Sequence, residues 1–236
     1  MNLLRFMGFS SKIIRLLSII AVITLLFGLF LSFSAPEDYR QGVLVKIMFL
    51  HVPFSWLSLL CYIMMTVCAI RILCSQCFFS GIALRSAAPI GSVFTVLALI
   101  TGSLWGRPVW GTWWEWDARL TSMLIFLLIY LSIVSLSRAF ENSRISTQAT
   151  AILTIIGCIN VPIIEFSVNW WNTLHQAASV LRWESPAISL YLLIPLMFMM
   201  LAFTMLFILF QLMSMRNDIL HWQIIVKQDC AYNKGV

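Results

Sequence analysis

The run Ile13–Phe33 reads IIRLLSIIAVITLLFGLFLSF and contains one charged residue, Arg15. A membrane hydrocarbon core about 30 Å thick is crossed by a helix of about 20 apolar residues, which is the length of this run. Five further apolar runs follow it: Ile47–Ile70, Pro89–Leu104, Leu120–Leu136, Ala149–Ile164 and Ala187–Met213. The sequence therefore predicts an all-α membrane protein with six transmembrane helices.

The composition supports this fold class. The chain is 61% hydrophobic and 10% charged, whereas soluble domains carry about 25% charged residues. No polar stretch is long enough for a separate soluble domain, so residues 1–236 are predicted to form a single membrane domain. The first run is longer than a signal-peptide core and is followed by Pro36, so we expect it to remain as an anchor.

The basic residues predict the orientation of the chain. If the N-terminus is inside, the inner segments hold Arg5, Lys12, Arg15, Arg71, Arg85, Arg138, Arg144, Arg216, Lys227 and Lys234. The outer segments then hold only Arg40, Lys46, Arg107, Arg119 and Arg182. Cations in short loops favour the inner side, so both termini are predicted inside. The net charge of +6 therefore predicts contact with membrane lipid and not with nucleic acid.

The six cysteines do not predict a disulfide framework. Cys74 and Cys77 have the spacing of a redox motif, but an isolated pair in a predicted inner loop is a weak signal. Phe78 stands where a c-type haem attachment motif needs a histidine. The chain also contains no P-loop, nucleophile elbow or HExxH motif, so nothing in it predicts a hydrolase.

The stretch Trp105–Arg119 (WGRPVWGTWWEWDAR) holds five of the ten tryptophans and lies in a predicted outer loop. Indole prefers a border where its face meets apolar matter and its N–H meets a partner. One or two tryptophans at a membrane surface are ordinary anchors. Five, interleaved with glycine and arginine, indicate a platform for a large flat ligand with acidic groups; anchoring alone is the alternative.

Two of the three histidines are predicted on the same side as this loop. His51 lies at the outer end of the second run and His175 in the last outer loop, whereas His221 lies inside. Neutral imidazole is a common metal ligand, and haem iron accepts axial histidine. His51 and His175 are therefore the candidate iron ligands; hydrogen-bonded surface histidines are the alternative. The other candidate contacts are Trp110, Trp113, Trp114, Trp116, Trp170, Trp171 and Asp117, with Lys46, Arg107, Arg119 and Arg182 as cations for the propionates.

These residues also carry a family resemblance. Trp110–Ser122 (WGTWWEWDARLTS) resembles the WWD signature of haem-handling membrane proteins. Leu50–Pro53 (LHVP) and Trp170–Gln176 (WWNTLHQ) resemble the two histidine segments of the CcmC family. The resemblance covers about residues 36–185, and a chain of six spans is similar to CcmC and shorter than its relatives CcmF and CcsA. One position departs from the signature, since Glu115 stands where an apolar residue is usual.

The resemblance implies a role. CcmC presents haem b at the outer, periplasmic face of the bacterial inner membrane and delivers it to the haem chaperone CcmE. It works with the ABC-type subunits CcmA and CcmB and with CcmD. His51 and His175 match the axial ligands of the family, and Arg119 matches the arginine of its motif. Whether the chain assists covalent attachment of haem to CcmE, and whether the membrane is bacterial or mitochondrial, stays open.

Two other functions compete with this reading. A membrane cytochrome b subunit for electron transfer would place its histidines within the hydrocarbon core, whereas His51 and His175 are both predicted at the outer margin. A transporter permease would need a polar path through the helices, which intramembrane ionisable groups usually mark. Apart from Arg15, the six runs contain no Asp, Glu, Lys or Arg, which argues against such a path.

Overall fold

The computed structural model describes residues 3–139, 143–171, 173–175 and 188–232, with the backbone alone for 143 and 225–232. Within these residues the regular structure is helical and contains no strand. The elements are α1 (Leu3–Ser34), the 3₁₀ helix η1 (Val43–Ile47), α2 (Met48–Ser75), α3 (Phe78–Trp110), α4 (Ala118–Ala139), α5 (Ser143–Gly157), α6 (Asn160–Trp170) and α7 (Leu190–Tyr232). The predicted all-α fold class is confirmed.

In the described part of the chain, six helical segments are long and apolar enough to cross a membrane. They are Leu3–Ser34, Val43–Ser75, Phe78–Trp110, Ala118–Ala139, Arg144–Trp170 and Leu190–Ile224. The first five contain the predicted runs in full, and the sixth contains the last run from Leu190 onward, because Ile188 and Ser189 precede α7 and Ala187 lies outside the described residues. The protein is a multi-pass membrane protein with the predicted number of spans.

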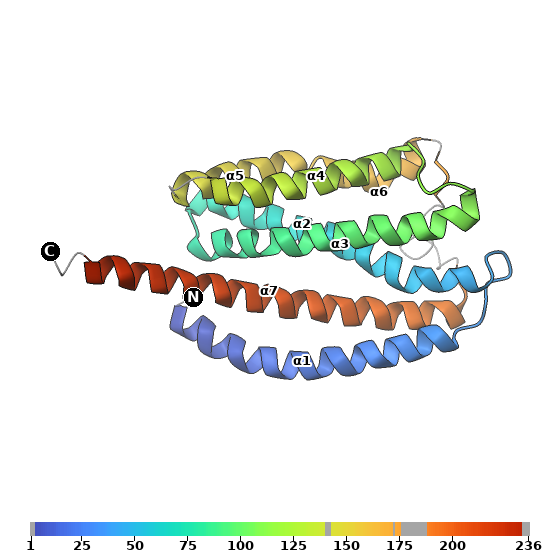
Figure 1. Ribbon diagram of the computed structural model, residues 1–236, viewed down its shortest axis with the longest axis horizontal. Helices are drawn as coiled ribbons and strands as arrows, with labels where there is room; N and C mark the ends of the chain where they lie inside the picture. The colour runs from blue at the N-terminus through green and yellow to red at the C-terminus, as the bar shows by residue number, and fades with distance from the viewer. Residues whose placement is uncertain (1–2, 140–142, 172, 176–187, 233–236) are drawn as a thin grey trace.

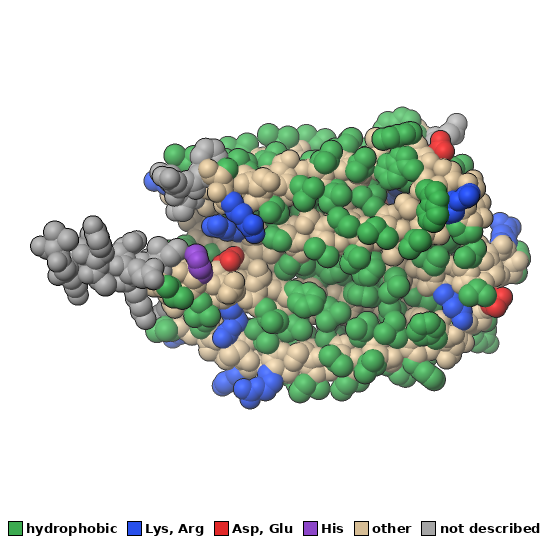
Figure 2. Space-filling view, viewed as in Figure 1, with side chains coloured by type: hydrophobic (Ala, Val, Ile, Leu, Met, Phe, Trp, Pro, Cys, Tyr) green, Lys and Arg blue, Asp and Glu red, His purple; other side chains and the backbone are tan. Residues whose placement is uncertain are grey.

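The six spans form one elongated bundle (Figure 1). Helices α1 and α7 lie side by side along one edge, α2 and α3 occupy the middle, and α4, α5 and α6 cover the other edge. The N-terminus and the end of α7 lie at one end with the α2–α3 turn, and the α3–α4 loop lies at the opposite end. Figure 2 shows a hydrophobic band between two ends where Lys and Arg side chains gather. The fold therefore places the segments predicted inside at one end of the bundle and the segments predicted outside at the other. That the end with the termini faces the inside of the membrane stays a prediction.

The fifth span consists of two helices. Helix α5 ends at Gly157 and α6 begins at Asn160, with Cys158 and Ile159 in a turn between them. Pro162 explains this break, because its ring lacks an N–H and clashes with the carbonyl four residues earlier, that of Cys158. The single run predicted at Ala149–Ile164 is correct as a span but not as one continuous helix.

The last helix is much longer than its apolar run. Helix α7 continues from Leu190 to Tyr232, although the apolar pattern ends at Met213. Its polar extension is fastened to the bundle: Arg216 donates hydrogen bonds to the Met7 carbonyl (2.6 Å) and the Ser10 hydroxyl (2.8 Å) of α1. An apolar run is only as long as the part of a helix that lies in the hydrocarbon core. The run Ala187–Met213 therefore could not predict that α7 continues beyond the core.

Two buried tyrosines join the central helices. The Tyr130 hydroxyl of α4 donates to the Ser58 carbonyl of α2 (2.6 Å), and the Tyr62 hydroxyl of α2 donates to the Thr154 carbonyl of α5 (3.1 Å). A Cβ at Gly91 would lie 2.4 Å from the Tyr130 ring, so α3 approaches α4 closely only because this residue is glycine. These contacts join α2, α4 and α5, and the ends of α2 and α4 opposite the termini carry the candidate site.

Candidate functional site

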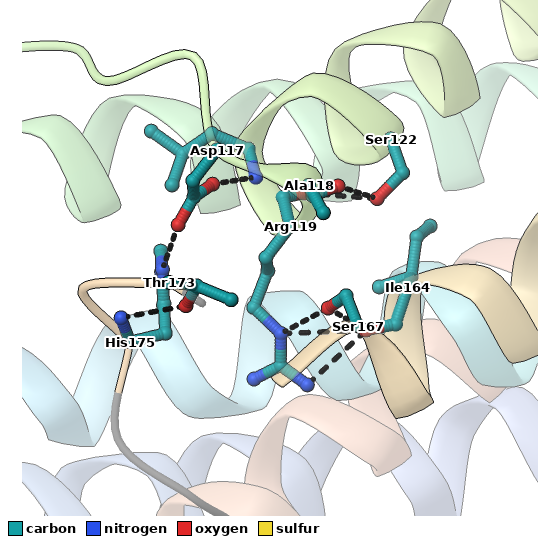
Figure 3. Close-up of polar contacts among 9 residues, drawn as sticks. Asp117, Ala118, Arg119, Ser122, Ile164, Ser167, Thr173 and His175 are labelled. Carbon is teal, nitrogen blue, oxygen red and sulfur yellow. Dashed lines mark hydrogen bonds and ion pairs between the residues drawn. The ribbon is translucent and has the colours of Figure 1, made fainter. Parts of the chain in front are cut away.

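The candidate site lies at the end of the bundle opposite the termini. It combines the first turn of α2, the end of α3, the α3–α4 loop and residues 173–175, which are distant in sequence. His51 belongs to α2. His175, labelled in Figure 3, follows α6. The structure thus places both predicted histidines at one end of the bundle. His221 lies near the opposite end, in the extension of α7.

His51 is held by one ring nitrogen. Its Nδ1 lies 3.1 Å from the Ala98 carbonyl oxygen and 3.1 Å from the Thr101 hydroxyl, both on α3. A carbonyl oxygen only accepts hydrogen bonds, so Nδ1 carries the proton in the neutral ring. The other nitrogen, Nε2, then keeps its lone pair, which is the form of imidazole that binds a metal.

Small and aromatic residues of α3 complete the surroundings of His51. A Cβ at Gly102 would lie 3.0 Å from the His51 Cε1, so glycine lets the imidazole lie against the helix backbone. The Trp105 ring meets the imidazole edge-on, with centroids 5.8 Å apart, and its Nε1 donates to the Gln41 side chain over 2.9 Å. The sequence did not predict these contacts of His51, because Gly102 precedes the tryptophan-rich stretch and Gln41 lies far from it in the chain.

His175 is held in the same manner by a carboxylate. Its Nδ1 lies 3.3 Å from Oδ2 of the buried Asp117, and the other carboxylate oxygen accepts the backbone N–H of Leu120 over 2.7 Å (Figure 3). Asp117 therefore caps the start of α4 and orients the imidazole at the same time. The carboxylate directs the proton to Nδ1 and leaves Nε2 as the metal-binding nitrogen.

The environment keeps His175 neutral at pH 7. Burial lowers the pKa of His175 below its ordinary value of 6.5, and this effect exceeds the opposing attraction of Asp117. The Arg119 cation lowers the same pKa further. The Trp110 ring packs against the imidazole with centroids 4.8 Å apart. A neutral, oriented imidazole beside an indole is suited to bind the iron of a flat, aromatic ligand.

The tryptophans of the α3–α4 loop differ in exposure. Trp113 and Trp116 are 56% and 74% exposed, whereas Trp114 is half-buried and its Nε1 is fully buried. Among the described residues this Nε1 has no hydrogen-bond partner, and a buried donor without an acceptor is costly. An acidic ligand group would supply the acceptor, so the loop suits a ligand with carboxylates. Trp170, the last residue of α6, and Trp171, which follows it, are also more than half exposed.

Three of the cations predicted to bind propionates donate hydrogen bonds to backbone carbonyls of the protein. Lys46 Nζ donates to the Phe33 carbonyl at the end of α1 over 2.7 Å, and Arg107 donates to the Gly111 carbonyl. Arg119 donates through Nε and Nη2 to the Ile164 carbonyl of α6 (3.3 and 3.2 Å) and through Nη2 to that of Glu165 (Figure 3). These cations thus have structural partners. Arg182 lies outside the described residues, and Glu115 is exposed.

Comparison with known proteins connects this geometry to a family. The family profile of "Heme exporter protein C" (CcmC) matches residues 2–229. A heme exporter protein C of Bradyrhizobium diazoefficiens is 48% identical over 94% of this chain and 85% of its own length. That of Escherichia coli K12 is 44% identical over 86% and 82%. A ccmC-like mitochondrial protein of cytochrome c biosynthesis from Marchantia polymorpha is 41% identical over 79% and 78%.

Proposed function

We propose, from the premise that the chain belongs to the heme exporter protein C (CcmC) family, that His51 and His175 bind the iron of haem at the outer face of the membrane. Membership of the family gives the chain a role in haem export for cytochrome c biogenesis. The finer assignment concerns the ligands, the form of haem and the acceptor. We assign haem b, which is bound without a covalent link.

The observation that carries the assignment is that the two imidazoles have the same tautomer, with the proton on Nδ1. His51 and His175 each use Nδ1 for an oxygen acceptor, Ala98 or Asp117. Both therefore present an unprotonated Nε2, and two such nitrogens fill the axial positions of a haem iron, whose in-plane ligands come from the porphyrin. Two surface histidines with only a structural role would not need the same tautomer.

The remaining site residues are assigned from the tryptophan-rich motifs of the sequence and from the contact between Trp110 and His175. Trp110 contacts the imidazole directly, and Trp113, Trp114, Trp116, Trp170 and Trp171 supply indole surface for the porphyrin. The buried Nε1 of Trp114 is assigned to a propionate, as is Nη1 of Arg119, which has no bond among the residues drawn in Figure 3. Lys46 and Arg107 are assigned to the rim of the ligand, where they can exchange a carbonyl for a propionate.

Delivery of haem requires one ligand to exchange. His51 lies in the first turn of α2 and is packed against α3, whereas His175 lies beyond the end of α6 and its ring contacts Asp117 and Trp110 at the α3–α4 loop. We assign His175 as the ligand that exchanges first, and CcmE as the acceptor that docks over the tryptophan loop. CcmA, CcmB and CcmD are the assigned partners, and the bacterial inner membrane is the assigned location.

An absorption spectrum of the purified protein tests this function. Protein isolated with haem should show a low-spin spectrum, and His51→Ala or His175→Ala should lower haem content or change the spectrum, with partial rescue by imidazole. His221→Ala is the matched control and should change neither. Loss of bound haem on coexpression with CcmE would support handover, whereas haem that stays bound and cycles redox state would support the cytochrome b alternative. Equal spectra in all three variants would exclude the ligand assignment.

A further inference from the structure

The structure has a second candidate site at the end of the bundle that holds the termini. A cleft of about 320 Å³ lies between the α2–α3 turn, the beginning of α3, the beginning of α5 and the polar part of α7. Its polar lining includes Gln76, Arg85, Arg144, Gln148 and Asp218. None of the residues assigned to haem lines this cleft, which lies at the opposite end of the spans.

The charge of the cleft favours an anion. Arg85 of α3 and Arg144 of α5 reach it from two different helices, and Asp218 of α7 is the one acidic residue among its described lining residues. One oxygen of Asp218 accepts the Ser86 hydroxyl over 2.8 Å. The described lining residues thus carry two guanidinium groups and one carboxylate, a formal charge of one positive unit, and guanidinium is the side chain best suited to bind phosphate oxygens.

The backbone adds to this positive potential. The cleft is lined by residues of the first turns of α3 and α5, including Phe78 and Ser146. The N-terminal end of a helix carries a partial positive charge and free N–H groups. Neither helix has an acidic residue in its first turn to neutralise that charge. The backbone thus reinforces the two arginines.

The walls of the cleft indicate where the anion comes from. Ile72, Ile82 and Leu84 line its apolar part. Phe78 and Trp222, 44% and 43% exposed, meet edge-on at its mouth with centroids 5.3 Å apart. Exposed aromatic rings of this kind mark the border between lipid and water. A lipid would place its headgroup among the arginines and its acyl chains along the apolar wall.

We propose that this cleft binds the phosphate group of an anionic phospholipid. The lipid belongs to the leaflet at the end of the bundle that holds the termini. Basic pockets between transmembrane helices recognise such headgroups through charge and hydrogen bonds. Bound there, the lipid bridges α3, α5 and α7.

Native mass spectrometry of the full chain in detergent, with phosphatidylglycerol added, tests the proposal. Arg85→Gln and Arg144→Gln should each weaken lipid binding about fivefold. Asp218→Asn should strengthen binding, because it removes a like charge and keeps an acceptor for the Ser86 hydroxyl. Arg15→Gln is the matched control, since Arg15 is an exposed cation of α1 outside the cleft, and it should leave binding unchanged.

Two further arms identify the source of the phosphate. Phosphatidylcholine should bind more weakly than phosphatidylglycerol, and inorganic phosphate should not displace the lipid. Displacement by inorganic phosphate, with the same dependence on Arg85, would overturn the lipid assignment in favour of a soluble phosphate. Equal lipid binding by the wild type, Arg85→Gln and Asp218→Asn would overturn the site itself. Thermal unfolding of each variant without lipid checks that the variant is folded. Asp218→Asn is expected to strengthen binding, a change that misfolding would not produce.

Discussion

The Nδ1 of His175 lies 3.3 Å from Oδ2 of Asp117, and this carboxylate also accepts the backbone N–H of Leu120 through its other oxygen. One side chain thus joins the start of α4 to the segment that follows α6. Because each oxygen has its own donor, the carboxylate satisfies both groups at once. The start of α4 therefore determines the tautomer of an imidazole 58 residues later in the chain.

Asp117→Asn should weaken haem binding by about tenfold or more, the usual cost of losing a partner of a metal-binding histidine. Leu120 and His175 approach different oxygens of the carboxylate, and an amide has an acceptor oxygen at only one of these two positions. If its NH₂ faces the ring, Nδ1 becomes the acceptor and the proton moves to Nε2, the nitrogen assigned to iron. Titration of the purified protein with haem, followed by absorbance, measures the loss.

The helix cap provides the control for this substitution. Asparagine is a good N-cap, so thermal stability of the haem-free Asp117→Asn protein should stay near that of the wild type. Asp117→Ala removes the cap as well and should lower both stability and haem affinity. If Asp117→Asn binds haem as tightly as the wild type, the contact between Asp117 and His175 has no role in ligand binding.

Trp114→Phe should lower haem affinity more than it lowers the stability of the haem-free protein. The Nε1 of Trp114 is buried without a partner among the described residues, and such a donor costs about 1–3 kcal/mol. Phenylalanine removes that cost together with the hydrogen bond assigned to a propionate. Trp116→Phe is the matched control, because Trp116 is 74% exposed. Equal haem affinity in both variants would show that Trp114 contributes surface alone.

The sequence predicted the spans well and the partners of the site residues poorly. Apolar length determines membrane crossing directly, so six runs sufficed for six spans. Topology then placed His51 and His175 at one end without any knowledge of packing. The acceptor of each Nδ1 could not be predicted, since Ala98 contributes a backbone carbonyl that leaves no trace in residue type.

The predicted propionate cations also show that residue type does not identify a hydrogen-bond partner. Arg119 was predicted to bind a propionate, yet two of its nitrogens donate to backbone carbonyls of α6. A guanidinium suits a carboxylate and a row of carbonyls equally well, so its residue type does not distinguish a ligand from a neighbouring helix. The choice depends on the end of α6, which packs beside α4.

Arg119→Lys should destabilise the haem-free protein by about 1–3 kcal/mol, as expected when charged hydrogen bonds are lost. Lysine has a single nitrogen, so it loses the second donor, because Nε and Nη2 of Arg119 both donate to the Ile164 carbonyl. Arg107→Lys is the control, because Arg107 is exposed and bonds within its own loop. Thermal unfolding measures both. A haem defect in Arg119→Lys with unchanged stability would assign the residue to the ligand and not to the contact with α6.

Thiol labelling should establish the orientation of the bundle. A membrane-impermeant maleimide applied from outside should label Thr112→Cys in the tryptophan loop and should not label Cys77 in the α2–α3 turn. Each cysteine is tested alone, in a variant whose other cysteines are serine. Labelling of Cys77 from outside, with Thr112→Cys protected, would reverse the predicted topology and move the haem site to the inner face.

The rate of Cys77 labelling in opened membranes should depend on pH. Hydrogen bonding by the Ser80 hydroxyl and backbone N–H lowers the pKa of the Cys77 thiol below its ordinary value of 9.0. A lower pKa means more thiolate at pH 7, and the thiolate is the reactive form. Cys77 should therefore react faster near pH 7 than the same thiol in Ser80→Ala, and the difference should vanish above pH 9, where both thiols are ionised. A Ser80→Ala protein with an unchanged rate at pH 7 would show that the hydrogen bond from the Ser80 hydroxyl does not set the reactivity of Cys77.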